Sequence, residues 1–561
     1  MILVVTVLFP LFCFRTIFYR YHTAYPLQTQ ALYTTFWYLQ KHPSPHSQAR
    51  SASVYLSTAM DFLNPAKERR HRIALFAGYL LVAIAIAIAS TVLLYASYGY
   101  TVDRKGDVQQ RGLVFVSSQP TGASVSVDGV KKAVTNTKLE LHTGIHTLRV
   151  SAEGYRSWER TIAVTGGDVQ RYDYPFLIPT NLSTTTSANY GSAIEFATQS
   201  PNRKRLLVLD KSAPEQFSLM AINDPKKLKS SIVKVPDALI TAGTGVQSWQ
   251  PLEWASDSKN ILFAHNYTVE AQTNKEYIVV NVEKPELSQN ISKQLGLAQE
   301  EVVTLFDKKP DHFYGYSPST KTLRSFTIES QDSRTILPAV LAYKTYANDT
   351  VLYVTSQPPS GKVIADQVSV VLQQGSRTTT LRRYSTNQPP DTSYLLDIAR
   401  YDSQWYVTIG STADKGVYVY KNPQTQVLET GSLPKPWRFI SVASPRYVAF
   451  SDTARFILVQ SGATIGVYDA EMVETKRYTL TDPMDSPQSN LSWMDGHRLL
   501  YVSQGKVVMM DYDNQNKQLL QPALPGFKPF LAPDFHTMYT LAPLMTDTSS
   551  VVLTQTALVA Q

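Results

Sequence analysis

One long apolar segment interrupts an otherwise mixed pattern of hydrophobic and polar positions. No charged residue occurs from Ile73 to Val102 in a chain of 561 residues. A helix from Ile73 to Tyr95 would be roughly 34 Å long at 1.5 Å per residue, which is enough to cross a hydrocarbon core of roughly 30 Å. Tyr and Phe residues lie at both ends, where amphipathic rings suit the membrane interfaces. We predict a transmembrane helix over residues 73–98, which makes the lipid bilayer the first expected partner.

The charges on the two sides of this segment predict its orientation. The sequence from Lys67 to Arg72 is strongly basic, whereas the charges from Asp103 to Asp107 nearly cancel. The positive-inside rule therefore predicts a single-pass protein with a cytoplasmic N-terminus and extracellular C-terminal domains. A buried core helix and a cleaved signal peptide are the alternatives. The apolar run exceeds the 7–15 residues of a signal-peptide core, and no small-x-small cleavage site follows it.

Residues 1–59 show neither helical nor strand periodicity beyond a short apolar start. Met60 then begins a short basic stretch. We interpret residues 1–59 as an N-terminal extension that is not translated natively, and residues 60–72 as a cytoplasmic basic tail. The alternative is a second hydrophobic segment over residues 1–18 that forms a hairpin with the first. Mass spectrometry of the native N-terminus distinguishes the two interpretations.

After a linker over residues 103–111, the pattern changes to strict alternation. Apolar and polar positions alternate in short runs such as 123–127 and 145–150, separated by Gly, Pro and Asp-Gly turn signals. About six short strands in roughly 70 residues predict a small antiparallel sandwich over residues 112–178.

The residues at these turns resemble the PEGA domain family. The motif positions, in chain order, are Pro120, Gly122, Ala123, Asp128, Gly129, Gly144, His146, Gly154 and Tyr155. Thr121 stands where the family has Glu, at a turn position. The resemblance implies a surface-exposed β module of bacteria and archaea that is often found next to a membrane anchor. It implies no catalytic residue.

Residues 181–561 repeat another pattern, in which two apolar strands flank a polar turn. The turns centre on positions 202, 257, 311, 349, 402, 452, 495 and 534, at intervals of about 38–55 residues. The clearest copies contain Trp254, Asp257, Asp452, Trp493, Asp495 and Gly496. Such a period suits four-stranded blades, so we predict a β-propeller with eight blades and no convincing helix. Seven blades remain an alternative if the last segment, up to Leu558, completes the first blade.

The copies resemble the TolB-like and WD-repeat-like propellers. The unit of those families runs from an apolar residue through Trp-Ser-Pro-Asp-Gly to a second apolar strand. Only Asp495-Gly496 keeps the turn pair here, and no copy has the full Ser-Pro-Asp-Gly sequence. The resemblance therefore extends to blade architecture and to no particular activity.

Charge and cysteine content narrow the function classes. The net charge is +8, but residues 1–180 carry 18 basic and 10 acidic residues, which leaves 35 of each in residues 181–561. A nucleic-acid-binding face concentrates basic residues on the folded domain, so nucleic acid is not an expected partner. The one cysteine, Cys13, excludes an intrachain disulfide framework and a zinc cluster.

Candidate chemistry is sparse. No Gly-x-Ser-x-Gly sequence occurs, and His142 and His146 lie too far apart along a strand to form a metal pair. We expect His497 and His536 to be solvent-exposed near blade turns, and residues 511–514 to form a solvated turn rather than a calcium loop. The sequence thus predicts no catalytic, cofactor-binding or metal-binding residue and no cofactor.

The fold class expected is mainly β: one transmembrane helix, a small PEGA-like sandwich and a C-terminal propeller. The function expected is that of a non-catalytic, membrane-anchored cell-surface protein that binds another protein, peptidoglycan or a glycan. The alternative is a propeller enzyme that acts on an envelope glycan or peptide at a site in its axial channel. Converging carboxylates or histidines with perturbed pKa values in that channel would favour the enzyme.

Overall fold

The computed structural model describes residues 65–102, 108–191, 193–245, 247–330, 333–347, 350–359, 365–486, 489–544 and 547–559. The predicted extension over residues 1–59, residues 60–64 of the predicted basic tail and the turn at position 349 lie outside these ranges. The chain divides into two compact units, residues 1–92 and 93–561. Each unit is described by itself.

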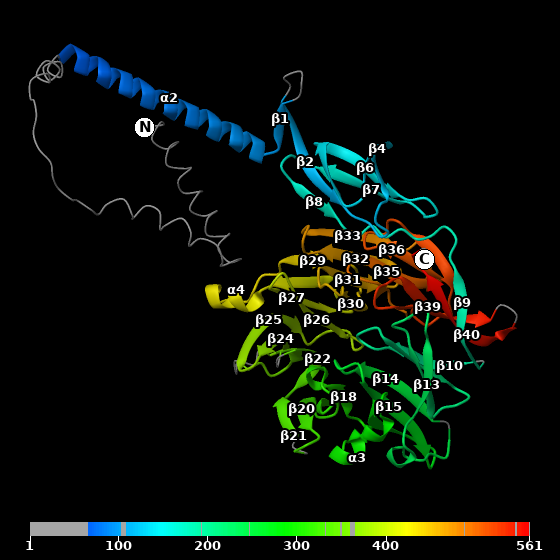
Figure 1. Ribbon diagram of the computed structural model, residues 1–561. Coiled ribbons are helices and arrows are strands. Elements are labelled where there is room, and N and C mark those ends of the chain that lie inside the picture. Colours follow the sequence, from blue (N-terminus) through cyan, green and yellow to red (C-terminus); the bar gives the residue numbers. More distant parts are fainter. Residues whose placement is uncertain are drawn as a thin grey trace, which may run out of the picture. The chain divides into compact units, whose positions relative to one another are not determined.

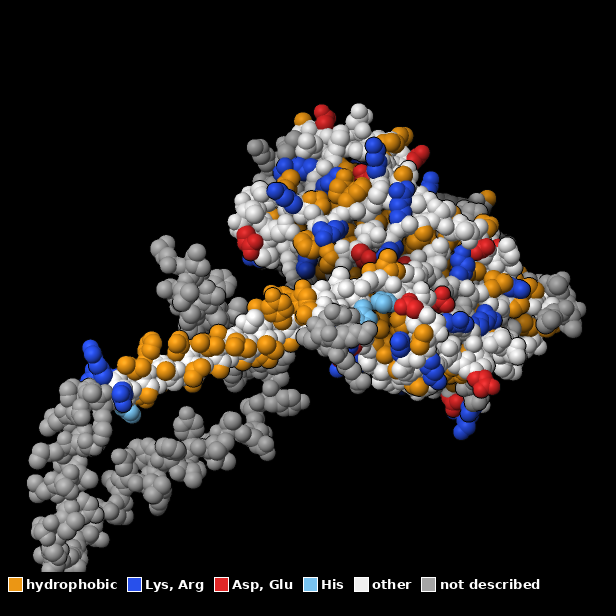
Figure 2. Space-filling view, turned by 90° about the horizontal axis from the view of Figure 1, so that it is seen from above, with side chains coloured by type: hydrophobic (Ala, Val, Ile, Leu, Met, Phe, Trp, Pro, Cys, Tyr) orange, Lys and Arg blue, Asp and Glu red, His pale blue; other side chains and the backbone are white. Residues whose placement is uncertain are grey.

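Helix α2 (Pro65–Ser97) contains the long apolar segment. Its part from Arg69 to Ser97 is long and apolar enough to cross a membrane, and the side chains of that part are exposed. Figure 2 shows hydrophobic side chains along the helix and basic side chains at its start. Among the described residues, this helix therefore lacks the burial expected of a core helix.

The sandwich consists of two four-stranded sheets. One contains β1 (Tyr100–Val102), β2 (Val108–Val116), β5 (Thr137–His142) and β8 (Val169–Tyr172), with β8 parallel to β2. The other contains β4 (Val130–Val134), β3 (Ser124–Val127), β6 (Gly144–Ser151) and β7 (Trp158–Val164). Burial alternates residue by residue along β7, as a half-buried strand requires. Eight strands form where six were expected, because β1 precedes the predicted span and the exposed β4 carries two lysines instead of an alternating pattern.

Eight further four-stranded antiparallel sheets form the propeller, and the colours of Figure 1 follow them in chain order around the ring. Blades 1 to 4 consist of β10 (Ile194–Gln199), β11 (Arg205–Asp210), β12 (Gln216–Ala221) and β13 (Lys229–Lys234); β14 (Ser248–Trp254), β15 (Asn260–Val269), β16 (Gln272–Asn281) and β17 (Gln289–Asn290); β18 (Val302–Leu305), β19 (His312–Ser317), β20 (Thr322–Thr327) and β21 (Ser333–Leu337); and β22 (Val340–Tyr346), β23 (Thr350–Thr355), β24 (Gln367–Gln374) and β25 (Arg377–Ser385).

Blades 5 to 8 consist of β26 (Tyr394–Tyr401), β27 (Gln404–Ser411), β28 (Val417–Lys421) and β29 (Arg438–Ile440); β30 (Tyr447–Phe450), β31 (Phe456–Ser461), β32 (Thr464–Asp469) and β33 (Glu474–Thr479); β34 (Ser492–Trp493), β35 (Arg498–Ser503), β36 (Lys506–Asp511) and β37 (Gln518–Pro522); and β38 (Phe530–Leu531), β39 (Thr537–Leu544), β40 (Asp547–Ala557) and β9 (Thr184–Tyr190). The strands of each blade are called A to D in this order.

The last blade closes the ring with the first strand of the propeller. Strand β9 pairs with β40, so that Ala188 lies opposite Leu553 and Tyr190 lies opposite Val551. The predicted eight blades are confirmed. The seven-blade alternative is wrong, because the C-terminal segment has its own blade and receives its fourth strand from the N-terminal end. Seven of the eight predicted turn positions lie between strands A and B, and position 349 is the one outside the described residues.

Two short helices interrupt the propeller, where none was expected. Helix α3 (Ile291–Leu295) begins after Asn290, whose side chain accepts from the Lys293 amide, and it ends at Gly296 in the left-handed region. Helix α4 (Pro423–Thr430) ends at Gly431 in the same conformation. Helices of five and eight residues are too short to show a helical period in the sequence.

Candidate functional site

The order of the strands gives the propeller two distinct faces. In an antiparallel blade, the A–B and C–D connections lie at one end of the strands, and the B–C and D–A connections lie at the other. We call these ends the AB face and the DA face. The sandwich packs on the AB face, and a cavity opens at the DA face.

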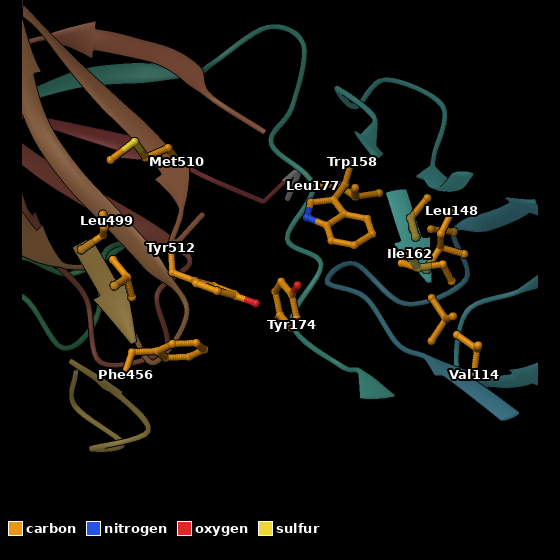
Figure 3. Close-up of a cluster of buried hydrophobic side chains, with 14 of the residues drawn as sticks. Val114, Leu148, Trp158, Ile162, Tyr174, Leu177, Phe456, Leu499, Met510 and Tyr512 are labelled. Carbon is orange, nitrogen blue, oxygen red and sulfur yellow. The ribbon is translucent and has the colours of Figure 1, made fainter. Parts of the chain in front are cut away.

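The sandwich packs on the AB face, mainly at blade 7. The Trp158 indole donates to Asp511 over 2.8 Å, and the Glu159 amide donates to the Asn516 side chain over 2.8 Å. Asp511 is the last residue of strand C of blade 7, and Asn516 lies in the C–D connection that follows. Figure 3 shows Trp158 and Tyr174 between the sandwich core and Tyr512 of the propeller. Apolar residues of the sandwich and of blades 6 and 7 form one continuous core, which we call the junction.

A buried arginine lies at the centre of the junction. Arg160 is 2.9 Å from Asp513 and donates to the hydroxyl groups of Tyr512 and Tyr174 over 2.9 and 2.5 Å. The Arg160 and Asp513 side chains are 9% and 2% exposed. Burial also raises the pKa of Asp511 to about 6. The expectation of a solvated turn at residues 511–514 is therefore wrong, because the sandwich covers that turn.

The two histidines near blade turns differ in their surroundings. The His497 ring stacks on Tyr174, with ring centroids 4.4 Å apart and planes 6° apart, and burial lowers its pKa to about 4. The expectation of an exposed His497 is thus wrong, because the segment that contains Tyr174 covers this turn. The His536 side chain is 42% exposed, in line with the expectation, and its Nε2 atom lies 2.8 Å from the side-chain Nε2 atom of Gln119.

The PEGA motif residues build turns within the sandwich. Asp128 and Gly129 have φ values of 51° and 79°, the conformation of a tight hairpin turn between β3 and β4. The His146 Nδ1 atom is 2.7 Å from Asp128, and its Nε2 atom donates to the His142 carbonyl over 2.9 Å. The hydrogen bond to Asp128 raises the pKa of His146, and the same bond lowers the pKa of Asp128.

The remaining motif residues also have local structural partners. The Pro120 carbonyl accepts from the Ser118 hydroxyl over 2.6 Å, and the buried Ala123 donates its amide to Thr135 over 3.0 Å. Positive φ values occur at Gly122, Gly144 and Gly154, where chain turns favour glycine, and Tyr155 bridges to Pro179. None of these contacts leaves a set of side chains directed at a ligand.

The predicted blade-turn residues repeat one local geometry. Asp257 accepts from the amides of Lys259 and Asn260 over 2.8 and 3.0 Å. Asp495 accepts from the amides two and three residues later in the same way, over 2.7 and 2.9 Å. Any side chain at Gly496 would place its Cβ atom 2.8 Å from Thr453. An aspartate that accepts from the following amides stabilises the turn, so these positions are structural.

Trp254, Trp493 and Asp452 each link their own blade to another blade. Trp254 donates to Thr198 of blade 1 over 3.0 Å, and the Trp493 ring lies 5.9 Å from that of Phe456 in blade 6. Asp452 forms an ion pair with Arg203.

The Arg203–Asp452 pair spans the AB end of the propeller axis. Arg203 lies in the A–B turn of blade 1 and Asp452 in that of blade 6, and these blades are not neighbours in the ring. The Arg203 guanidinium also lies 4.3 Å from the ring centroid of Phe535, in the A–B turn of blade 8. Three turns therefore meet across this end of the channel.

A cavity of about 640 Å³ opens at the DA face, on the other side from the sandwich. Its walls come from β10, blade 7 and the D–A connections that precede blades 7 and 8. Its lining includes Glu195, Phe196, Ser486, Ser489, Asn490, Phe527 and Lys528. Within the part of the chain that the structure describes, the cavity combines one ammonium group, one carboxylate and several hydroxyl and amide groups.

Lys528 is the uncommitted charge of this cavity. It is exposed to water, yet surrounding protein lowers its pKa by desolvation against the opposing effect of Asp452. It makes neither a hydrogen bond nor an ion pair with any residue in the described ranges. Glu195, by contrast, accepts from the Trp249 amide over 2.5 Å with its Oε1 atom.

Acidic residues on the inner strands connect consecutive blades, a feature that the sequence analysis missed. Glu253 of β14 accepts from the Leu305 amide over 2.8 Å and pairs with Lys308. Asp397 of β26 accepts from the Phe450 amide over 3.3 Å and lies 3.4 Å from Lys344. With Glu195, three carboxylates thus satisfy amides on the inner strand of the next blade. The available signal was one isolated acidic residue in each of these three inner strands.

A second feature that the sequence analysis missed is a buried polar network in blade 2. The Glu276 carboxylate is 2.9 Å from His265 Nδ1 and accepts from the Thr241 amide, the Thr241 hydroxyl and Asn290 over 2.7–2.8 Å. Burial acts to raise the pKa of Glu276, but these hydrogen bonds lower it to about 2. The His265 Nε2 atom lies 2.9 Å from Gln247. Each member has a partner, so the network is structural.

The described residues contain no group of three His, Cys, Asp or Glu side chains that could hold a metal ion. Residues 111–177 match the PEGA domain family. This match covers the sandwich and the end of its linker, and it leaves the propeller without a family assignment. None of the curated proteins compared with the chain matches it.

Solved structures resemble the chain at low identity. An oligogalacturonate lyase in complex with manganese is 9% identical, with a TM-score of 0.36, over 67% of this chain and 98% of its own. A dihydro-heme d1 dehydrogenase, NirN, is 11% identical, with a TM-score of 0.36, over 72% and 73% of the two chains. Dipeptidyl peptidase 4 of Porphyromonas gingivalis is 12% identical, with a TM-score of 0.40, over 65% and 58%. No activity is transferred from these proteins.

Proposed function

We propose that this chain is a membrane-anchored cell-surface protein whose propeller binds a ligand without chemical turnover. The observation that carries the proposal is the cavity at the DA face, the face opposite the sandwich. Its polar groups suit recognition, because the side chains of Ser486, Ser489 and Asn490 make no hydrogen bond with another described residue and remain available for a ligand.

The location proposed is the outer surface of a cell membrane, with a cytoplasmic N-terminus. Helix α2 has the length and composition of a membrane span, and PEGA is an extracellular-type domain. The basic residues from Lys67 to Arg72 favour the cytoplasmic side for the start of the helix.

Lys528 favours a second candidate, a propeller enzyme that acts on an envelope glycan or peptide in the same cavity. A lysine with a lowered pKa is suited to proton transfer. Acid–base chemistry on such a substrate generally uses a second group, and Glu195 already accepts from the Trp249 amide. We therefore rank binding above catalysis.

A photo-crosslinking residue at Ser489, in the cavity wall, tests the binding function in intact cells that make the full chain. We expect a discrete crosslinked partner from position 489 and none from the same residue at Lys211, an exposed position on blade 1. Purified protein should release no product from isolated envelope material. Product formation that disappears in Lys528→Ala would establish the enzyme instead.

Substitution of Ala85 by lysine tests the membrane anchor. A lysine near the centre of a transmembrane helix costs about 2.5 kcal/mol on the insertion scale, so part of the protein should move from the carbonate-resistant membrane pellet to the soluble fraction. Ala85→Leu is the matched control and should remain in the pellet. Recovery of the unaltered chain in the soluble fraction would contradict the anchor.

A further inference from the structure

The two charged side chains of the DA-face cavity differ in how many of their polar atoms have a partner among the described residues. Lys528 has no partner among the described residues, so its ammonium group retains three donors for a ligand. The Oε1 atom of Glu195 accepts from Trp249, and its Oε2 atom makes no hydrogen bond with a described residue. The cavity therefore offers a cation that can bind an anionic group and a second side chain that can accept from an N–H group.

Three further polar side chains line the same opening. Ser486, Ser489 and Asn490 form no side-chain hydrogen bond with other residues in the described ranges, and they supply both donors and acceptors. Phe527 adds apolar wall, whereas the Phe196 side chain is only 6% exposed and packs against Phe217 and Phe263. A ligand that fits has a negative end, alternating N–H and C=O groups and an apolar portion.

The cavity also limits the size of a ligand. The volume of about 640 Å³ lies in the range of small-ligand sites. A chain end of a few residues fits such a site better than a chain that passes through.

We propose that the DA-face cavity binds the C-terminal end of a peptide, with Lys528 as the partner of its free carboxylate and Glu195 as an acceptor for its last amide. This assignment rests on the proposed binding function and specifies its ligand. A uronic acid offers the same carboxylate, but it has no amide N–H beside that group for the Glu195 carboxylate to accept. The peptide is therefore favoured.

Fluorescence anisotropy with the full chain in detergent micelles tests the assignment. The probe is an N-terminally labelled Ala-Ala-Leu peptide with a free carboxylate, compared with its C-terminal amide. Because a hydrogen bond to a charged group contributes about 1.5–3 kcal/mol, the amide should bind at least about tenfold more weakly. Lys528→Ala should weaken binding of the acid by a similar factor, and Lys528→Arg should restore most of it. Lys506→Ala, an exposed lysine of blade 7, is the matched control and should leave binding unchanged.

The alternative results separate this assignment from the proposed function. Equal binding of acid and amide, or binding unaffected by Lys528→Ala, would overturn it. Binding of a galacturonate trimer or N-acetylmuramate in place of the peptide would overturn the peptide and keep the binding function. A crosslink from position 489 without affinity for any of these probes would likewise overturn the peptide and keep the binding function. Absence of both the crosslink and all probe binding would refute the binding function as well.

Discussion

Substitution of Arg160 by methionine is expected to destabilise the sandwich–propeller unit by about 3–5 kcal/mol. The loss is large because methionine removes the cation and leaves the Asp513 carboxylate, only 2% exposed, without its ion-pair partner. The hydroxyl groups of Tyr174 and Tyr512 lose a donor at the same time. Urea unfolding of the full chain in detergent micelles, followed by circular dichroism, measures the change.

Two further variants distinguish the ion pair from the loss of a large side chain. Arg149→Met alters an exposed arginine of the same sandwich and should change stability by less than about 0.5 kcal/mol. Asp513→Asn combined with Arg160→Met removes both charges and should recover part of the loss, since a neutral side chain is cheaper to bury unpaired. If Arg160→Met and Arg149→Met had equal effects, the junction would not depend on this pair.

The blade architecture was predictable because each blade repeats local chemistry. An apolar strand, an aspartate that accepts from the next amides and a second apolar strand occupy one short window, as at Asp257 and Asp495. The same holds for the Asp128-Gly129 turn of the sandwich. Such features depend on neighbours two or three residues away, so they are present in the sequence itself.

The junction and the cavity were not predictable in the same way. His497 and Asp511 occupy turn positions that are usually solvated, and they are buried only because residues more than 300 positions earlier cover them. The closure of the ring by β9 likewise depends on a partner at the opposite end of the propeller. Contacts at such separations leave no period in the sequence, and an alternating or apolar run does not specify which surface will cover it.

The surroundings of Lys528 could not be predicted for the same reason, because they also depend on contacts between distant segments. Its side chain is exposed, as that of a lysine in a connecting segment usually is. What the sequence could not supply is that two D–A connections, blade 7 and β10 form one cavity around it, or that the neighbouring carboxylate already accepts from the Trp249 amide. A functional site assembled from separate blades becomes visible only when the ring has closed.

Substitution of Glu276 by glutamine is expected to lower the stability of the propeller by about 3 kcal/mol near neutral pH and to remove a pH dependence in acid. The pKa of Glu276 is about 2 in the folded protein, against about 4.3 for an unperturbed glutamate. A group with a depressed folded pKa stabilises the fold above its unfolded pKa and loses that contribution as the pH falls towards the folded value. The deficit of Glu276→Gln should therefore be full above pH 5 and shrink steadily towards pH 2.

The matched control for this prediction is Glu286→Gln, an exposed glutamate a few residues along the same blade. It should leave both the stability and its slope between pH 3 and pH 6 unchanged, because a solvated carboxylate has nearly the same environment before and after unfolding. Urea midpoints of the full chain at four or five pH values give the slope directly. A deficit of Glu276→Gln that stayed constant from pH 7 to pH 3 would assign the effect to altered hydrogen-bond geometry around His265 and Thr241, and the carboxylate charge would then contribute nothing to stability.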